Sequence, residues 1–204
     1  MEKKKRNLLV VTHTAPYPPS RNGETLRVHN LLHHLHAEWA IDLICLQPCE
    51  KKYEEALSSI YHEVFLTDAA EHLQEGYEQK GYFSKIRFLF SPPQHLFSLN
   101  YPYSPAMHQL TTKIAASKKY DAILAVRAHI FGFYLNNLRN FNITCDVGDS
   151  TNLFLKSLAK TRIWGKERLS LYYAYFYNKR WEKRYLLCAC KKITAITERD
   201  KNES

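Results

Sequence analysis

The sequence predicts an α/β protein with a doubly wound parallel sheet, and three observations lead to that prediction. The apolar run Leu8–Val11 breaks into a turn-rich loop and then a helical segment, which is how a βα unit begins. Ala122–Val126 is an uninterrupted apolar run, typical of a strand buried on both faces of a parallel sheet. Strand-like and helix-like segments alternate along the chain, which is the pattern of a doubly wound sheet.

The apolar and β-branched runs predict six strands. They lie at Asn7–Val11, Ile41–Leu46, Glu63–Leu66, Ala122–Val126, Asn142–Cys145 and Lys191–Ala195. The segments between them predict helices over Glu24–Ala37, Lys51–Ser59, Asp68–Phe90, Pro105–Ser117, Ile130–Leu138, Thr151–Thr161 and Trp164–Cys190. Asp68 is the expected N-cap of the third helix, and Pro105 is the expected first residue of the fourth.

The length of 204 residues allows one large globular domain or one and a half. Hydrophobic residues make up 45% of the chain and charged residues 24%, as in soluble globular proteins. No apolar run approaches the roughly 18 to 20 residues that span a bilayer. The apolar stretch after the basic start is too short for a signal-peptide core, so we expect a cytoplasmic location.

The spacing of the cysteines and histidines does not predict a metal site. The five cysteines have no metal-binding spacing, and Cys45 and Cys145 lie in apolar runs, as small buried residues do in a reducing compartment. His33 and His36 would share a helix face, but no carboxylate or cysteine joins them at ligand spacing. We therefore expect no bound metal.

The loop Thr12–Gly23 is the first candidate site. Its length, about twelve residues, exceeds the usual two to six of a βα connection, and long loops are more often functional. Gly23 would admit a close backbone approach with a positive φ, and the first helical N–H groups would face a phosphate. Asn22, Gly23 and Arg27 are therefore predicted to bind phosphate. The alternative is a plain connection, since Pro and Gly are ordinary loop punctuation.

The positive charge is concentrated late in the sequence. Lys156–Lys192 holds eleven basic and two acidic residues, so it carries the whole net charge of +9. Aromatic residues interleave with the basic ones, which suits an anionic membrane surface. The predicted membrane contacts are Lys179, Arg180, Lys183 and Arg184. The same composition would suit nucleic acid, which we judge the less favoured partner, or an aromatic stripe packed against the domain.

Three motifs in this order resemble family-4 glycosyltransferases of the retaining GT-B type. Pro16-Tyr17-Pro18-Pro19 followed by Gly23 and Arg27 resembles their N-terminal loop, in the form found in bacterial exopolysaccharide-associated sugar transferases. Asp146–Ser150 resembles the stretch that follows a central strand. The segment from Trp181-Glu182 to Thr197-Glu198 resembles the long helix and the strand end after it.

The resemblance implies that residues 1–204 are the Rossmann-like, acceptor-side half of a GT-B enzyme. The nucleotide-sugar-binding C-terminal half is then absent, and these residues are expected to be inactive alone. The implied activity is sugar transfer from a nucleotide-sugar donor to a lipid-linked or saccharide acceptor, in cell-surface polysaccharide or glycolipid synthesis. No metal or other cofactor is implied.

The resemblance also implies catalytic residues near the end of the central strand. Family members often carry a histidine there that contacts the donor sugar, whereas this chain has Arg127, with His129 two residues on. Either side chain would serve that pocket, with Arg127 adding charge against the leaving phosphate. Asp149 would contact an acceptor hydroxyl or cap the helix from Thr151. Two other classes remain open: a non-catalytic phosphate- or nucleotide-binding module, and a basic membrane- or nucleic-acid-binding protein.

Overall fold

The computed structural model describes residues 5–47, 51–67, 104–148, 151–162, 165–186 and 190–195. Its centre is one six-stranded sheet in which every strand pair is parallel, in the order β3-β2-β1-β4-β5-β6. The strands are β1 Arg6–Thr14, β2 Trp39–Gln47, β3 Glu63–Leu66, β4 Ala122–Val126, β5 Ile143–Gly148 and β6 Lys192–Ala195. The doubly wound parallel sheet predicted from the sequence is confirmed.

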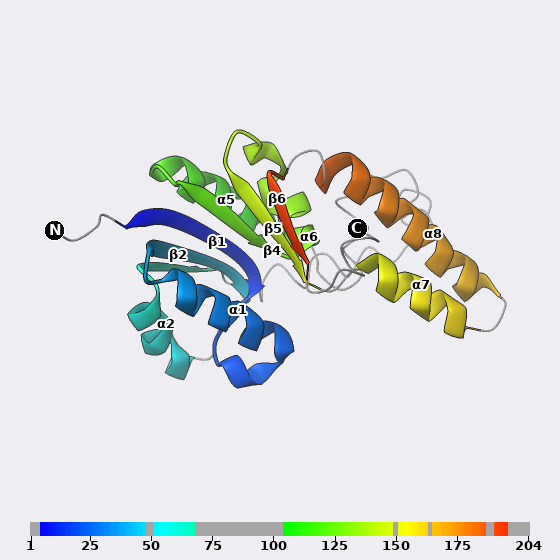
Figure 1. Ribbon diagram of the computed structural model, residues 1–204, viewed down its shortest axis with the longest axis horizontal. Coiled ribbons are helices and arrows are strands. Elements are labelled where there is room, and N and C mark those ends of the chain that lie inside the picture. The colour runs from blue at the N-terminus through cyan, green and yellow to red at the C-terminus, as the bar shows by residue number, and fades with distance from the viewer. Residues whose placement is uncertain are drawn as a thin grey trace.

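Helical segments cover both faces of the sheet (Figure 1). The α-helices are α1 Gly23–Leu35, α2 Glu54–Ile60, α5 Pro105–Ser117, α6 Ala128–Ile130, α7 Thr151–Thr161 and α8 Lys166–Trp181. Short 3₁₀ turns lie at Pro19–Arg21, Lys51–Tyr53 and Asn136–Leu138, and π turns at Phe131–Leu135 and Glu182–Leu186.

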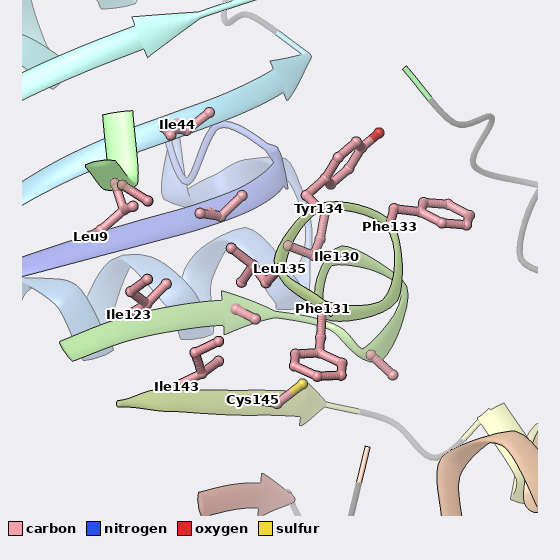
Figure 2. Packing of buried hydrophobic residues seen from close by; sticks show 14 of the residues in the cluster. Leu9, Ile44, Ile123, Ile130, Phe131, Phe133, Tyr134, Leu135, Ile143 and Cys145 are labelled. Atoms are coloured by element: carbon pink, nitrogen blue, oxygen red, sulfur yellow. The ribbon is translucent and has the colours of Figure 1, made fainter. Parts of the chain in front are cut away.

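The alternation of side chains along β1 creates two hydrophobic cores. Leu8 and Val10 face one side of the sheet, where they cluster with buried residues of α1, α2 and β2. Leu9 and Val11 face the other side and cluster with residues of α5 and of the π turn Phe131–Leu135. Figure 2 shows Phe131 and Leu135 of this π turn beside the strands, whereas Phe133 extends away from them. Because successive strand residues point to opposite faces, a fully apolar strand is covered on both sides.

The strand order reverses between β1 and β4. The chain runs from β1 outward to β2 and β3, then returns to place β4 on the other side of β1. In open α/β sheets, ligands bind beyond the carboxyl ends of the strands at such a reversal. The loops after β1 and β4 therefore define where a site is expected.

Helices α7 and α8 pair as a hairpin that extends away from the sheet beyond β5 and β6 (Figure 1). A buried polar cluster joins their inner ends: Asn178 donates to Glu182 at 2.9 Å and to Asn152 at 2.9 Å, and Asn152 also donates to Glu182. Burial raises the pKa of Glu182 to about 7 against the opposing effects of both amides.

Several predicted boundaries were wrong in detail. The helix expected over Ile130–Leu138 begins earlier, at Ala128, and widens into the π turn, where Gly132 lies against the ring of Trp181. The long helix expected over Trp164–Cys190 ends as a regular α-helix at Trp181. The predicted helix Asp68–Phe90 lies outside the described residues.

The fifth strand also runs further than its apolar residues indicate. The sequence predicts its end at Cys145, but β5 continues through Asp146 to Gly148. Asp146 is buried there because Arg27 and Thr194 supply partners for its carboxylate. Cys45 and Cys145 are buried as expected.

Candidate functional site

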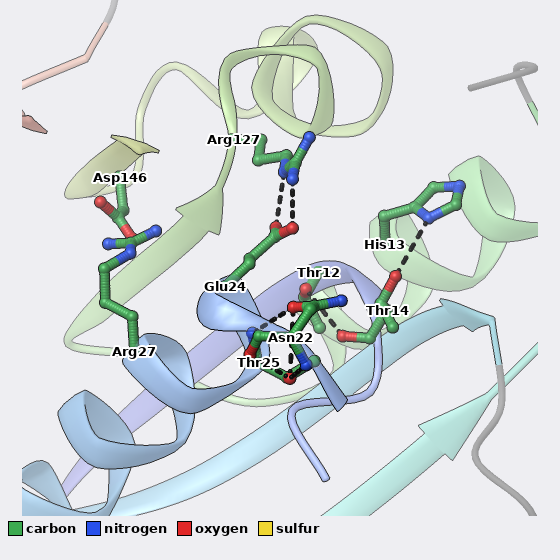
Figure 3. A network of polar contacts seen from close by, with 9 residues as sticks. All are labelled: Thr12, His13, Thr14, Asn22, Glu24, Thr25, Arg27, Arg127 and Asp146. Atoms are coloured by element: carbon green, nitrogen blue, oxygen red, sulfur yellow. Dashed lines mark hydrogen bonds and ion pairs between the residues drawn. The ribbon is translucent and has the colours of Figure 1, made fainter. Parts of the chain in front are cut away.

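The start of α1 lies at the carboxyl edge of the sheet, next to the ends of β1, β4 and β5 (Figure 3). Asn22 caps this helix: its side-chain oxygen accepts the amide of Thr25 at 2.9 Å, and the Thr25 hydroxyl accepts the amide of Asn22 at 3.0 Å. Of the donors that a helix start leaves unpaired, those of Gly23 and Glu24 have no partner among the described residues. The Asn22 side chain thus occupies one position predicted for phosphate, while the first two amides stay open.

Gly23 does not have the positive φ predicted for it. Among the described glycines, Gly148 has that conformation, at φ 66°. No heavy atom comes within 4 Å of the position where a Cβ of Gly23 would lie, so the backbone is open to a close approach from outside.

Arg127 follows β4 directly and has a φ of 81°, a backbone conformation that residues other than glycine rarely adopt. Its amide donates to the Asp146 carbonyl at 2.6 Å. Its guanidinium makes a bidentate ion pair with Glu24 in the first turn of α1, with Nε 2.5 Å from Oε1 and Nη2 against Oε2. The charge predicted to face a leaving phosphate is therefore countered by Glu24 in this structure.

Arg27 is paired in the same way. Its Nη1 lies 2.5 Å from Oδ2 of Asp146, whose side chain is only 3% exposed. Thr194 of β6 donates to the other carboxylate oxygen at 3.1 Å. A Cβ on Gly148 would lie 3.2 Å from the Arg27 guanidinium, so glycine leaves room for this pair.

Two buried histidines lie at the same edge. The rings of His13, on β1, and His129, after β4, meet edge to face with centroids 5.9 Å apart. Burial and the nearby Arg127 charge lower the pKa of His13 to about 4. Burial, His13 and Arg127 lower the pKa of His129 well below its usual value. Both imidazoles are therefore neutral at pH 7, a form in which a ring both donates and accepts hydrogen bonds.

The structure brings Asn22, Gly23, Arg27 and Arg127 together at the start of α1, and His129 lies beside Arg127. Their roles in binding and catalysis stay predictions. Asp149 lies outside the described residues, so its predicted role stays a prediction. Glu24 and His13 belong to this site but are not predicted from the sequence. The position of His13 at the end of an apolar strand is the one signal that would have drawn attention to it.

The predicted membrane residues lie elsewhere, at the last turn of α8 and the π turn after it. Lys179, Arg180 and Lys183 are exposed there, and Arg184 belongs to the same turn. The aromatic residues divide between two environments: Tyr175 and Trp181 are buried, whereas Tyr173 and Phe176 are exposed. The expectation that the aromatic stripe packs into the domain therefore holds only in part. Within the ranges described, no helix is both long and apolar enough to cross a membrane.

No metal centre is formed by the part of the chain that the structure describes, where no three histidine, cysteine or carboxylate side chains gather. The chemical capacity of the carboxyl edge instead comes from two guanidinium groups, two open amides and two neutral imidazoles. Guanidinium and amide groups bind phosphate oxygens, and neutral imidazoles bind hydroxyl groups.

Comparison with known proteins gives little beyond this geometry. No protein-family model matches the sequence, and no curated protein matches it significantly. Among solved structures, the chain is similar to a sucrose-phosphate synthase from Thermosynechococcus elongatus, with 14% sequence identity and a TM-score of 0.44. The match covers 94% of this chain and 48% of the other, so the chain spans about half the length of that protein.

Proposed function

We propose that this chain is the acceptor-side domain of a retaining, nucleotide-sugar-dependent glycosyltransferase of the GT-B type, serving cell-surface polysaccharide or glycolipid synthesis. The sequence motifs support this proposal, and so does the carboxyl edge of the sheet. The observation that carries it is that Arg27 of α1 pairs with Asp146 of β5 and that Arg127, after β4, pairs with Glu24 of α1. Both guanidinium groups therefore lie between the start of α1 and the carboxyl ends of β4 and β5, at the reversal of strand order.

Sugar transfer from a nucleotide donor builds negative charge on the departing diphosphate. Fixed cations and helix amides directed at that charge lower the barrier without reorganising during the reaction. Glu24 and Arg27 are three residues apart on α1 and so share a face, which brings both guanidinium groups to the same part of the helix. In this proposal the diphosphate lies against that face and the amides of Gly23 and Glu24.

The two carboxylates at the site differ in how firmly they are held. Asp146 is buried and has a second partner in Thr194, whereas the Glu24 side chain is 27% exposed and has only Arg127 as its partner among the described residues. An anionic ligand would therefore displace Glu24 rather than Asp146. Arg127 would then transfer its two hydrogen bonds from Glu24 to the ligand.

The remaining side chains have proposed roles toward the sugar and the acceptor. His129, neutral and beside Arg127, would bind a hydroxyl of the sugar or of the acceptor. Asp149 would bind an acceptor hydroxyl. The acceptor itself is proposed to be lipid-linked or a saccharide.

The proposal is tested by calorimetric titration of the purified chain with pyrophosphate and with UDP-glucose. We expect Arg27→Gln and Arg127→Gln each to weaken binding about tenfold or more, because each loses a charge-assisted contact. Glu24→Gln should strengthen binding, because the competing carboxylate is gone.

Arg139→Gln is the matched control, since Arg139 is exposed and precedes β5 at the opposite edge of the sheet. Among the described residues its hydrogen bonds go to the neighbouring Asn136. Equal losses in this variant, or no binding of either ligand to the unmodified chain, would refute the anion site. Binding without sugar transfer in any two-domain form would instead favour a non-catalytic phosphate-binding module.

A further inference from the structure

Helix α8 has one buried face and one face that nothing in the described structure covers. Tyr175, Asn178 and Trp181 are buried: Asn178 contacts Asn152 of α7, and Trp181 packs against Gly132 of the π turn. On the opposite side, Leu169 is 63% exposed, Tyr173 42% and Phe176 65%. Large apolar side chains are normally exposed singly, so three on one helix face need an explanation.

These residues form a continuous stripe. Leu169, Tyr173 and Phe176 are spaced four and three residues apart, which places them on one face of an α-helix. Lys166 precedes the stripe on the same face, and Arg180 follows it; both are exposed. The stripe is therefore apolar in the middle and basic at its two ends, which lie about 21 Å apart along the axis at 1.5 Å per residue. We call these five residues the α8 stripe.

The surroundings of the stripe are strongly positive. The segment from the start of α7 to the end of the π turn after α8, residues 151–186, contains nine basic residues and two acidic ones, and one of the two, Glu182, is buried. The basic residues are Lys156, Lys160, Arg162, Lys166, Arg168, Lys179, Arg180, Lys183 and Arg184. Any occupant of the stripe must therefore accept apolar side chains and carry negative charge.

We propose that the α8 stripe lies on the surface of an anionic lipid bilayer. Leu169, Tyr173 and Phe176 would enter the boundary between headgroups and acyl chains, and the basic ends would contact lipid phosphates. A second copy of this chain would bring the same positive charges together, which opposes a symmetric pairing on this face. Nucleic acid would use the basic residues but not the aliphatic Leu169. This inference goes beyond the proposed sugar transfer and does not depend on it.

The test is flotation of the purified chain with vesicles of 30% phosphatidylglycerol in phosphatidylcholine, and with vesicles of phosphatidylcholine alone. We expect binding to the anionic vesicles that weakens with added salt, because surface charges are screened. The combined variant Leu169→Ser, Tyr173→Ser and Phe176→Ser should bind at least about tenfold more weakly, because it loses the apolar contribution. Lys166→Gln with Arg180→Gln removes both basic ends of the stripe and should weaken the preference for anionic vesicles.

Phe154→Ser is the matched control. Phe154 is also highly exposed, at 62%, but it lies on α7. It is two residues from Asn152, which is buried, and two residues from Lys156, whose amino group lies over the Tyr175 ring of α8. It therefore faces away from α8, and its substitution should leave vesicle binding unchanged.

Circular dichroism checks that each variant stays folded, as expected for exposed positions. Equal loss in Phe154→Ser, or no vesicle binding at all, would overturn the proposal. A nucleic-acid surface would also overturn it. In that case the chain would bind a single-stranded oligonucleotide, the basic variant would lose this binding, and the apolar variant would keep both oligonucleotide and vesicle binding.

Discussion

Arg127 illustrates at the scale of a residue how the site depends on an unfavourable backbone conformation. Its φ of 81° turns the chain at the end of β4, so that the guanidinium reaches Glu24 while the amide reaches Asp146. Such a conformation costs of order 1–3 kcal/mol for a residue other than glycine. The cost is sustained because three hydrogen bonds hold the residue in place.

A pair of substitutions separates the backbone cost from the loss of charge. Arg127→Gly and Arg127→Ala both delete the guanidinium, but only glycine adopts the positive φ without strain. We expect the glycine variant to be more stable by about 1 kcal/mol, measured as the free energy of unfolding in urea. Equal stabilities would mean that this φ carries no strain.

At the scale of an element, the C-terminal end of α8 packs against a glycine, Gly132. A Cβ added to Gly132 would lie 2.6 Å from Cζ2 of Trp181, closer than side-chain contacts allow, and Trp181 is buried and has little room to move. Trp181 at the end of α8 can therefore pack closely on the π turn only because residue 132 is a glycine.

The corresponding prediction is that Gly132→Ala lowers the free energy of unfolding by about 2 kcal/mol through overpacking. Gly165→Ala is the control, because nothing lies within 4 Å of its Cβ position and its φ of 165° is extended backbone. It should change stability by less than about 0.5 kcal/mol. Equal effects in urea denaturation would show that the contact with Trp181 is not tight.

Glu182 gives the α7–α8 hairpin a pH dependence. Burial raises its pKa from 4.5 to about 7, so between these values the folded state keeps a proton that the unfolded state has released. Stability from this group therefore falls as the pH rises from about 4.5 to 7, by about 3 kcal/mol in total. His13 acts in the opposite direction, because its lowered pKa costs stability as the pH falls below 6.5.

Comparison with Glu182→Gln isolates the glutamate, since His13 is common to both proteins. We expect the difference in unfolding free energy, variant minus unmodified chain, to grow by about 3 kcal/mol between pH 4.5 and pH 7.5. Urea denaturation across this range measures it. A difference independent of pH would mean that folding does not raise the pKa of Glu182.

At the scale of the whole molecule, the proposed function assigns only the acceptor side to these 204 residues. Transfer would need a second, nucleotide-binding unit closing over the carboxyl edge of the sheet. We therefore expect no transfer from radiolabelled UDP-glucose by these residues alone, in a chromatographic assay sensitive enough to detect single turnovers. Measurable turnover would show that the second unit is dispensable.

The sheet was predictable from the sequence because its central strands are apolar on both faces, and runs such as Ala122–Val126 have no other plausible environment. The partners within the site were not predictable. Glu24 and Arg127 are 103 residues apart, and Arg27 and Asp146 are 119 apart, so no local pattern links them. The same holds for the extension of β5, since Asp146 is tolerated in a strand only because its partners come from α1 and β6. The π turn was missed because its apolar residues also fit a regular helix.

The central position of β1 sets an order of events during synthesis. One edge of this strand pairs with β2 soon afterwards, but the other waits for β4, where Asn7 meets Asp121 across a separation of 114 residues. At a translation rate of roughly 5–20 residues per second, that edge is left open on the nascent chain for on the order of 10 s. During this interval the ribosome-bound polypeptide exposes an apolar strand, so molecular chaperones that shield such strands should raise the yield of native protein.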